Sequence, residues 1–348
     1  MTSLQHPDSI ALDPAVVLAA NVEENTVPRG MVHRAAVSEV FLTGAQRVAD
    51  GHFRCLAQLP RTHSYFSEHT HRDAHYDTLL LLEVFRQASI YVSHAFLDVS
   101  ANDKFIYLDS DTWIVEREAL VVGVRPASAL IEVRVVDEYV RHGQRSGVTL
   151  DMSLSLNGRV AARHERMAIR WMPDAAWHKM RNRAIAAVAP QADAKAQLPA
   201  PLAPFQVGRH WLNNVVLGRE IEVEDGQLVG SLIVDQANPA IFDHPLDHIP
   251  GMLLLEGFRQ IALLAAKRQA GLAPDELLLG RAKVVFARFG EFGLATRVKA
   301  HLGSLRLGED GRVLLALTVE QGGAELASAE VELQRLVQPA ALAAVGGA

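Results

Sequence analysis

A single cysteine, Cys55, occurs in the 348 residues of this sequence. One cysteine cannot form a disulfide within the chain, and such sparing use of cysteine is typical of proteins kept in a reducing compartment. We therefore expect a cytoplasmic protein. Cys55 stands in the alternating segment FRCLAQL, so we expect it to pack inside a β-strand and not to act as a nucleophile.

The sequence also lacks an excess of positive charge. Its 34 Lys and Arg residues are outnumbered by 40 Asp and Glu, and the net charge is −6, so nucleic acid is not an expected partner. The first residues have no basic start followed by an apolar run, so no signal peptide is expected. Residues 79–85 and 252–266 are the longest apolar segments, but Glu, Arg or Gln interrupts both. Neither is expected to span a membrane.

What the sequence does contain is an internal repeat. Residues 71–87, HRDAHYDTLLLLEVFRQ, align without a gap with residues 244–260, HPLDHIPGMLLLEGFRQ. Glu256 follows Glu83 by 256 minus 83, or 173 positions, and the paired His, Arg and Gln residues keep the same offset. With 49% hydrophobic residues the chain is long enough for two domains with real cores. The sequence therefore predicts two copies of one domain.

Polar side chains interrupt a helix that is otherwise apolar on nearly every side. The repeated polar residues of this helix are Glu83, Arg86 and Gln87 in the first copy and Glu256, Arg259 and Gln260 in the second. A buried carboxylate costs several kcal/mol unless it is paired or hydrogen-bonded. One interpretation is an internal Glu–Arg pair at i, i+3 that closes on itself. The repetition of His, Glu, Arg and Gln around one helix start favours a functional site.

The expected organisation is two α+β units of one plan. The chain is expected to divide into an irregular arm at 1–30, a first domain at 31–183, an Ala- and Pro-rich linker at 184–206, a second domain at 207–337 and a disordered tail at 338–348. Each unit has a long buried helix, at about 78–97 and 251–269, and Asp77 is the expected N-cap of the first. Antiparallel strands wrapped around such a helix form an α+β unit. Pairing the two units side by side would bury both helices in one continuous sheet.

Strands are expected before and after each helix. The predicted strands of the first unit cover residues 32–42, 52–59, 105–108, 119–124, 130–140, 149–156 and 160–170. Those of the second unit cover residues 228–234, 282–289, 295–305, 313–320 and 325–333. Asn157–Gly158 and Gly322–Gly323 predict tight hairpins between the last two strands of each unit.

The second copy resembles a known family. Residues 242–256, FDHPLDHIPGMLLLE, followed by Arg259 and Gln260, resemble the hotdog fold of the 3-hydroxyacyl-thioester dehydratases. They more closely resemble the A-factor synthase (AfsA-like) family of γ-butyrolactone biosynthesis proteins, which carry two hotdog copies in one chain. Residues 60–63 and 75–87 match the first-copy hallmark, and the resemblance spans roughly residues 30–335. It departs from the dehydratases at Phe242, where their histidine would stand.

The resemblance implies a tandem hotdog fold and an acyltransferase. The enzyme would move a β-ketoacyl group from a thioester, carried by acyl carrier protein or coenzyme A, to a hydroxyl of dihydroxyacetone phosphate. Two alternatives stay open: a hotdog thioester dehydratase or thioesterase, and a non-catalytic regulator that binds an acyl or lactone ligand. No cofactor is expected, and a zinc site at His69, His71 and His75 is not expected, since the second copy keeps only two of these histidines. A homodimer is one option for the assembly.

The repeated residues suit this chemistry. At the second helix start, Gly251 lets a thioester carbonyl approach unpaired backbone N–H groups. Burial is expected to raise the pKa of Glu256 or Glu83, which could then act as general base. The remaining expected site residues are His244, His248, His71 and His75 for orienting the thioester or protonating the thiolate, and Arg259, Arg86, Gln260 and Gln87 for binding substrate.

The resemblance also implies that each site takes residues from both halves. His244 and His248 are expected to face Glu83, and His71 and His75 to face Glu256. The second-copy helix start is expected to form the main site, because the first copy has the bulkier Asp77 and Thr78 there. Lys179, Arg181 and Arg183 could dock an acidic carrier protein or could form an ordinary solvated face. His94, His164, His178, His210 and His301 have no repeat partner and are expected to be surface or packing residues.

Overall fold

The computed structural model describes residues 24–68, 74–188, 190–191 and 197–336, and in these the strands form one antiparallel sheet. In chain order the strands are β1 (Leu42–Ala49), β2 (His52–Leu59), β3 (Lys104–Ile114), β4 (Ala127–Arg141), β5 (Gln144–Leu156), β6 (Arg159–Met172), β7 (Leu217–Glu224), β8 (Gln227–Leu232), β9 (Leu277–Phe286), β10 (Thr296–His301), β11 (Arg306–Leu307), β12 (Val313–Gln321) and β13 (Ala324–Arg335). Their order across the sheet is β1-β2-β4-β5-β6-β3-β9-β13-β12-β10-β8-β7, and β11 pairs with β12 at the side.

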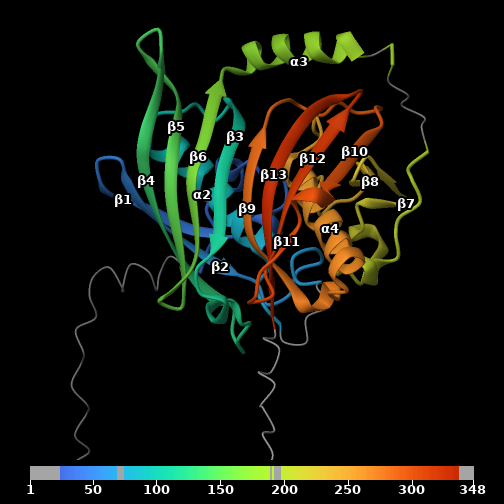
Figure 1. The fold of residues 1–348 in the computed structure, drawn as a ribbon. Helices are drawn as coiled ribbons and strands as arrows, with labels where there is room; N and C mark the ends of the chain where they lie inside the picture. The colour runs from blue at the N-terminus through green and yellow to red at the C-terminus, as the bar shows by residue number, and fades with distance from the viewer. Residues whose placement is uncertain (1–23, 69–73, 189, 192–196, 337–348) are drawn as a thin grey trace, which may run out of the picture.

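The two halves of the chain meet at the strand pair β3–β9. These strands are antiparallel, with Asp109 opposite Val285 and Trp113 opposite Arg281. The strand order on one side of this junction repeats on the other, so that β3, β6 and β5 correspond to β9, β13 and β12. Figure 1 shows the two halves side by side with the sheet running through both. The predicted continuous sheet is confirmed.

Two long helices pack against this sheet and touch each other. They are α2 (Thr78–Phe96) and α4 (Gly251–Ala270), close to the predicted bounds. As predicted, Asp77 caps α2, its carboxylate accepting from the Leu79 N–H at 2.9 Å. Helix α4 starts after Pro250 without a side-chain cap. Among the described residues no helix is long and apolar enough to cross a membrane.

Two predicted strands are wrong. Residues 32–42 contain the last residue of the 3₁₀ turn Arg29–Val32 and all of the 3₁₀ turn Val37–Glu39, and β1 begins only at Leu42. The reason is that this segment lies along α2. The Phe41 N–H donates to the Gln87 side chain at 2.9 Å and so does not bond a neighbouring strand. Residues 119–124 pair instead with the loop before α2, since Val122 N–H donates to the Ala74 carbonyl at 2.9 Å.

A third helix, α3 (Asp174–Val188), was not predicted and runs into the first five residues of the expected linker. Most of its side chains are exposed, but Trp177 and Arg181 are buried. Arg181 donates two bonds to the Glu291 carboxylate at 2.8 and 2.7 Å and one to the Asp247 carbonyl at 2.7 Å. Helix α3 is thus anchored by one face to the loop that precedes α4, and Arg181 is not part of an exposed basic cluster.

Candidate active site

Glu83 is fully buried in α2 and is paired with two arginines. Arg34 reaches it from the segment before β1, with Nη2 at 2.6 Å and Nε at 3.0 Å from its carboxylate oxygens. Arg86 Nη1 lies at 3.2 Å and Gln87 Nε2 at 2.8 Å. Gln87 also holds the backbone on either side of Val40, accepting from Phe41 N–H and donating to the Glu39 carbonyl.

Glu256 in α4 has the same surroundings. Arg209 Nε lies at 3.1 Å, Arg259 Nη2 at 2.6 Å and Gln260 Nε2 at 2.5 Å from its carboxylate. Gln260 in turn accepts from the Val216 N–H at 2.9 Å, as Gln87 does from Phe41. The predicted i, i+3 Glu–Arg pair is therefore present in both halves, with a second arginine added to each.

These arginines correct the expected ionisation of the two glutamates. Burial raises the pKa of each carboxyl, but two guanidinium groups outweigh it and hold the pKa of Glu83 and of Glu256 below the ordinary range. The expected rise in pKa is wrong. An ionised carboxylate locked between two cations is a poor general base, whereas it fixes both arginines firmly.

Arg34 and Arg209 were missed in the sequence, although a signal exists. The segments VHRAAVSEV at 32–40 and VGRHWLNNV at 207–215 align with Arg34 on Arg209, an offset of 209 minus 34, or 175. The helix repeat has an offset of 173, so a loop that is two residues longer hides the match. The structure shows the same equivalence, because Asp243 accepts from the N–H groups of Ala35 and Ala36 as Glu68 does from those of His210 and Trp211.

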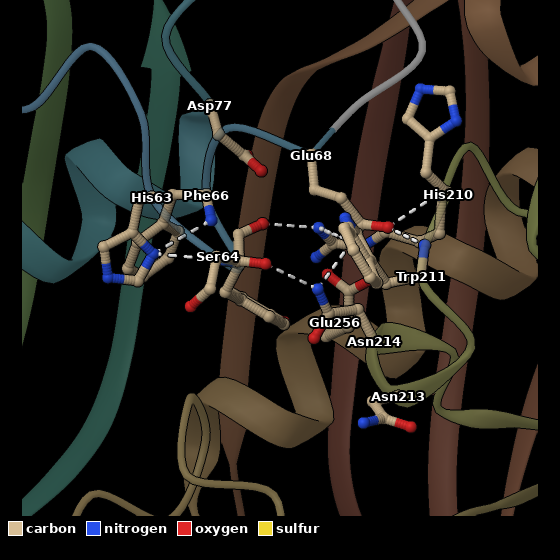
Figure 2. A network of polar contacts seen from close by, with 12 residues as sticks. His63, Ser64, Phe66, Glu68, Asp77, His210, Trp211, Asn213, Asn214 and Glu256 are labelled. Carbon is tan, nitrogen blue, oxygen red and sulfur yellow. Dashed lines mark hydrogen bonds and ion pairs between the residues drawn. The ribbon is translucent and has the colours of Figure 1, made fainter.

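The start of α2 is closed by polar contacts between the halves. Asp77 accepts both from Leu79 N–H and from Arg259 Nη1, the latter at 2.7 Å. Beside it, Glu68 also accepts from Asn214 Nδ2 at 2.5 Å, and Arg209 Nη1 donates to the Tyr65 carbonyl at 2.5 Å. Figure 2 shows the contacts of Glu68 with His210 and Trp211, which join the loop before α2 to the segment before β7. The cap and these contacts occupy the helix start where a substrate carbonyl would bind.

The start of α4 instead opens on a cavity of about 850 Å³ between the halves. Its lining includes the loop His244–Gly251 and Phe286 from the second half, and Leu82, Arg86, Ile90 and residues 105–108 from the first half. A cavity of this size suits a substrate with an acyl chain. The position equivalent to Asp77 is Pro250, which has no side-chain donor or acceptor, so the first N–H groups of α4 have no capping side chain.

Because Pro250 stands where the first half has Asp77, Arg86 of α2 and Arg259 of α4 have different bonding partners. Arg259 is 9% exposed and bonds Glu256 and Asp77, whereas Arg86 is 28% exposed and lines the cavity. Among the described residues Arg86 bonds only Glu83. Arg86 therefore keeps part of its side chain open to the cavity, and Arg259 does not line it.

Both predicted second-copy histidines line this cavity, and each is paired with the preceding aspartate. His248 Nδ1 lies 2.6 Å from Asp247, and His244 Nδ1 lies 3.3 Å from Asp243. Burial alone would raise the pKa of Asp247, but His248, Trp177 and Arg181 outweigh it and lower the pKa. A carboxylate that accepts from Nδ1–H leaves Nε2 of the imidazole for proton transfer.

The first-copy histidines are placed differently. His71 and His69 lie outside the described residues. His75 forms an isolated bridge with Val121 and does not line the cavity among the described residues. His244 and His248 were expected to face Glu83. They line the same cavity as Arg86, which bonds Glu83, but among the described residues Glu83 itself does not line this cavity, so the expectation stays a prediction.

Comparison with known proteins gives a consistent result. A family model described as the A-factor biosynthesis hotdog domain (AfsA) matches residues 19–171 and 190–336. The 2-oxo-3-(phosphooxy)propyl 3-oxoalkanoate synthase of Streptomyces virginiae is 39% identical over 239 residues, covering 68% of this chain and 76% of that protein. A protein of the same description from Streptomyces griseus subsp. griseus is 31% identical over 289 residues, covering 82% of this chain and 85% of its own.

Solved structures with a similar chain path include a pyran synthase domain from module nine of the sorangicin pathway. It is 13% identical, has a TM-score of 0.49 and covers 85% of this chain and 98% of its own. The family match covers both halves of the present chain, and the predicted tandem hotdog fold is confirmed.

Proposed function

The chain belongs to the A-factor biosynthesis hotdog family, and we propose that it is an acyltransferase that esterifies dihydroxyacetone phosphate with a β-ketoacyl group taken from a carrier thioester. The relatives' description, 2-oxo-3-(phosphooxy)propyl 3-oxoalkanoate synthase, names the product of that reaction. The observation that carries the proposal is the cavity itself. It combines a bare helix start, two aspartate-backed histidines and a partly free arginine.

The donor thioester carbonyl binds at the start of α4. The first N–H groups of a helix have no partner within the helix and carry its positive dipole end. They can stabilise the oxyanion that forms when the hydroxyl attacks. Gly251 keeps this position accessible, because a Cβ atom there would lie 3.3 Å from Phe286 Cζ and would fill the approach. The apolar wall formed by Leu82, Ile90 and Phe105 accepts the acyl chain.

His248 protonates the sulfur that leaves. Its Nδ1–H is held by Asp247, whose other oxygen accepts from Trp177 Nε1 at 2.9 Å, so the ring has one orientation. The imidazolium gives its Nε2 proton to the thiolate as the C–S bond breaks. The donor is carried by acyl carrier protein or coenzyme A, as the family resemblance implies.

Arg86 binds the phosphate of the acceptor, and Glu83 acts through it. Two buried bonds from Arg34 and one from Arg86 fix the carboxylate, which in turn holds Arg86 at the cavity wall. A guanidinium group is well suited to phosphate oxygens. Glu256, Arg259 and Gln260 form the equivalent cluster at the closed helix start and serve to hold the halves together.

Thiol release distinguishes this function from its alternatives. Purified protein is incubated with a β-ketoacyl thioester, with and without dihydroxyacetone phosphate, and free thiol and phosphorylated ester are measured. Release that requires the acceptor and yields the ester supports the transferase. Release without acceptor indicates a thioesterase, and conversion of a 3-hydroxyacyl thioester to an enoyl thioester indicates a dehydratase. Saturable binding with no turnover of either thioester indicates a regulator.

A further inference from the structure

His33 has a backbone conformation that favours glycine. Its φ angle is 52° and its ψ angle is 51°, in the left-handed region. The equivalent residue in the second half, at the same 175-residue offset as the arginine pair, is Gly208, with a φ angle of 68°. Glycine adopts this conformation without strain, whereas a side chain does not. The first half therefore keeps a histidine in a left-handed conformation for which the second half uses glycine, and this indicates a role for the imidazole ring.

Two hydrogen bonds fix the proton positions of this ring. His94 Nδ1 lies 3.0 Å from the Val99 carbonyl, which can only accept, so His94 Nδ1 carries a proton. In the neutral pair His94 Nε2 is then an acceptor, and His33 Nε2, 2.9 Å away, donates to it. His33 Nδ1 is left with a lone pair and without a partner among the described residues. Edge contacts of Phe105 with both rings, at 5.4 and 5.2 Å, hold them in place.

His33 lines the cavity together with Arg86 and Lys104. Burial is the largest cause that lowers the pKa of His33, to about 3, and it is followed by the neighbouring Arg86 and His94 on α2, Lys104 on β3 and His244 in the facing loop. Lys104 has a half-exposed partner in Asp174, at 3.4 Å, and the Arg86 side chain bonds Glu83 alone in the part of the chain that the structure describes. A neutral acceptor among cations suits a ligand that combines an anionic group with a hydroxyl donor.

We propose that His33, Arg86 and Lys104 form the acceptor subsite, in which the two cations hold a phosphomonoester and His33 Nδ1 accepts the hydrogen bond of the adjacent hydroxyl group. This rests on the proposed function and assigns its second substrate to named residues. His33 Nδ1 orients the hydroxyl as its oxygen forms the new C–O bond, and the hydroxyl proton passes to water. The C–S bond breaks and the thiolate takes a proton from the His248 imidazolium. The proton taken up by water then returns His248 to the protonated form.

A pair of ligands that differ by this hydroxyl tests the subsite. Dihydroxyacetone phosphate has the hydroxyl, and acetol phosphate lacks it. Dissociation constants are measured by calorimetry without any thioester, for the wild type, His33→Gly, His33→Asn and Lys104→Met. The matched control is His142→Gly, because His142 also has a φ angle of 52° but is exposed at the β4–β5 hairpin.

We expect the wild type and the His142→Gly control to prefer dihydroxyacetone phosphate by about tenfold or more. His33→Gly should fold, since Gly208 occupies the same conformation. It should bind both ligands with the affinity that the wild type has for acetol phosphate. His33→Asn, which tolerates the left-handed region and keeps an acceptor oxygen, should retain part of the preference. Lys104→Met should weaken both ligands by the same factor.

Two results would overturn the subsite: a wild-type preference that persists in His33→Gly, or no binding of either ligand to the wild type. The transfer assay keeps the two proposals apart. If the preference for dihydroxyacetone phosphate is lost in His33→Gly but the wild type transfers no acyl group, the proposed function alone is contradicted. Transfer to dihydroxyacetone phosphate that His33→Gly leaves unchanged contradicts the subsite alone.

Discussion

Glu256 shows how a residue that looks catalytic in the sequence can be a structural ion. It is fully buried between Arg209 and Arg259, and the second of these also bonds Asp77 of the other half. Removing one charge from a buried cluster leaves the remaining charges uncompensated, which costs far more than the cluster contributes as a whole. The helix motif alone does not reveal this, because Arg209 lies 47 positions upstream of Glu256, in a segment whose repeat has a different offset.

Glu256→Gln should therefore destabilise the fold. We expect the free energy of unfolding in urea to fall by about 3–5 kcal/mol, since two guanidinium groups lose their shared partner. Glu325→Gln, on the exposed side of β13, is the control and should change stability little. A Glu256→Gln variant as stable as the control would show that the buried pair is not needed for folding.

His164 should make stability depend on pH in the mildly acidic range. It is 1% exposed, and burial lowers the pKa of its imidazole to about 3 from an ordinary value of about 6.5. The unfolded chain binds a proton below about pH 6.5 that the folded chain does not bind until about pH 3. This contribution to stability is thus complete above pH 6.5 and is lost as the pH falls, by up to about 1.4 kcal/mol per pH unit.

The measurement is urea unfolding between pH 7 and pH 4. His164→Gln should show a shallower loss of stability with falling pH than the wild type, while some slope remains from His33. His142→Gln, at an exposed hairpin, should keep the wild-type slope. Equal slopes for His164→Gln and wild type would contradict the buried neutral imidazole.

At the scale of elements, the sequence predicted what depends on local pattern. The bounds of α2 and α4 follow from continuous apolar runs, from the Asp77 cap and from Gly271, which ends α4 in the left-handed region. Asn157–Gly158 and Gly322–Gly323 have the positive φ angles that tight hairpins require. Helix α3 was missed because only two of its side chains are buried, and those two bond distant residues.

Helix α3 should matter for catalysis through Trp177. Trp177→Phe keeps an aromatic ring beside His248 and Phe289 but loses the 2.9 Å bond to Asp247. A hydrogen bond to a charged group is worth about 1.5–3 kcal/mol, so we expect kcat for transfer to fall about ten- to a hundredfold. The donor KM should hardly change. Trp211→Phe, at a ring that is 68% exposed, is the control, and equal kcat values in the two variants would exclude a positioning role.

The start of α4 should respond to a methyl group. Gly251→Ala adds a Cβ 3.3 Å from Phe286 Cζ, at the bare N–H groups. Because alanine is the better helix former, stability should stay level or rise by up to about 1 kcal/mol, while transfer falls at least about tenfold. Gly257→Ala provides the opposite case, since its Cβ would lie 2.7 Å from Leu232 Cδ1 inside the core. It should lose stability and keep the transfer activity of the folded fraction; the reverse pattern would argue against an oxyanion site at Gly251.

For the whole molecule, the sheet junction makes the two halves one unit. Strands β3 and β9 pair directly, Thr78 Oγ1 of α2 donates to the Leu279 carbonyl at 2.6 Å, and Arg259 of α4 bonds Asp77 at the α2 start. The repeat in the sequence predicted the duplication and the shared sheet. The bulk of Asp77 and Thr78 already favoured the second helix start as the main site. The contacts of Asp77 and Arg209 across the two halves could not be predicted from the repeat.

We predict that one chain has one working site, at the start of α4. The most direct test is calorimetric titration of the full-length protein with a donor analogue in which a CH₂ group separates the β-ketoacyl carbonyl from the sulfur. This analogue resembles the donor but cannot transfer its acyl group. We predict one equivalent bound per chain, because α2 offers no second site. Binding should be much weakened in Gly251→Ala, because the added Cβ lies at the helix start where the thioester carbonyl binds. Two equivalents per chain, or one equivalent that Gly251→Ala leaves unchanged, would contradict the claim.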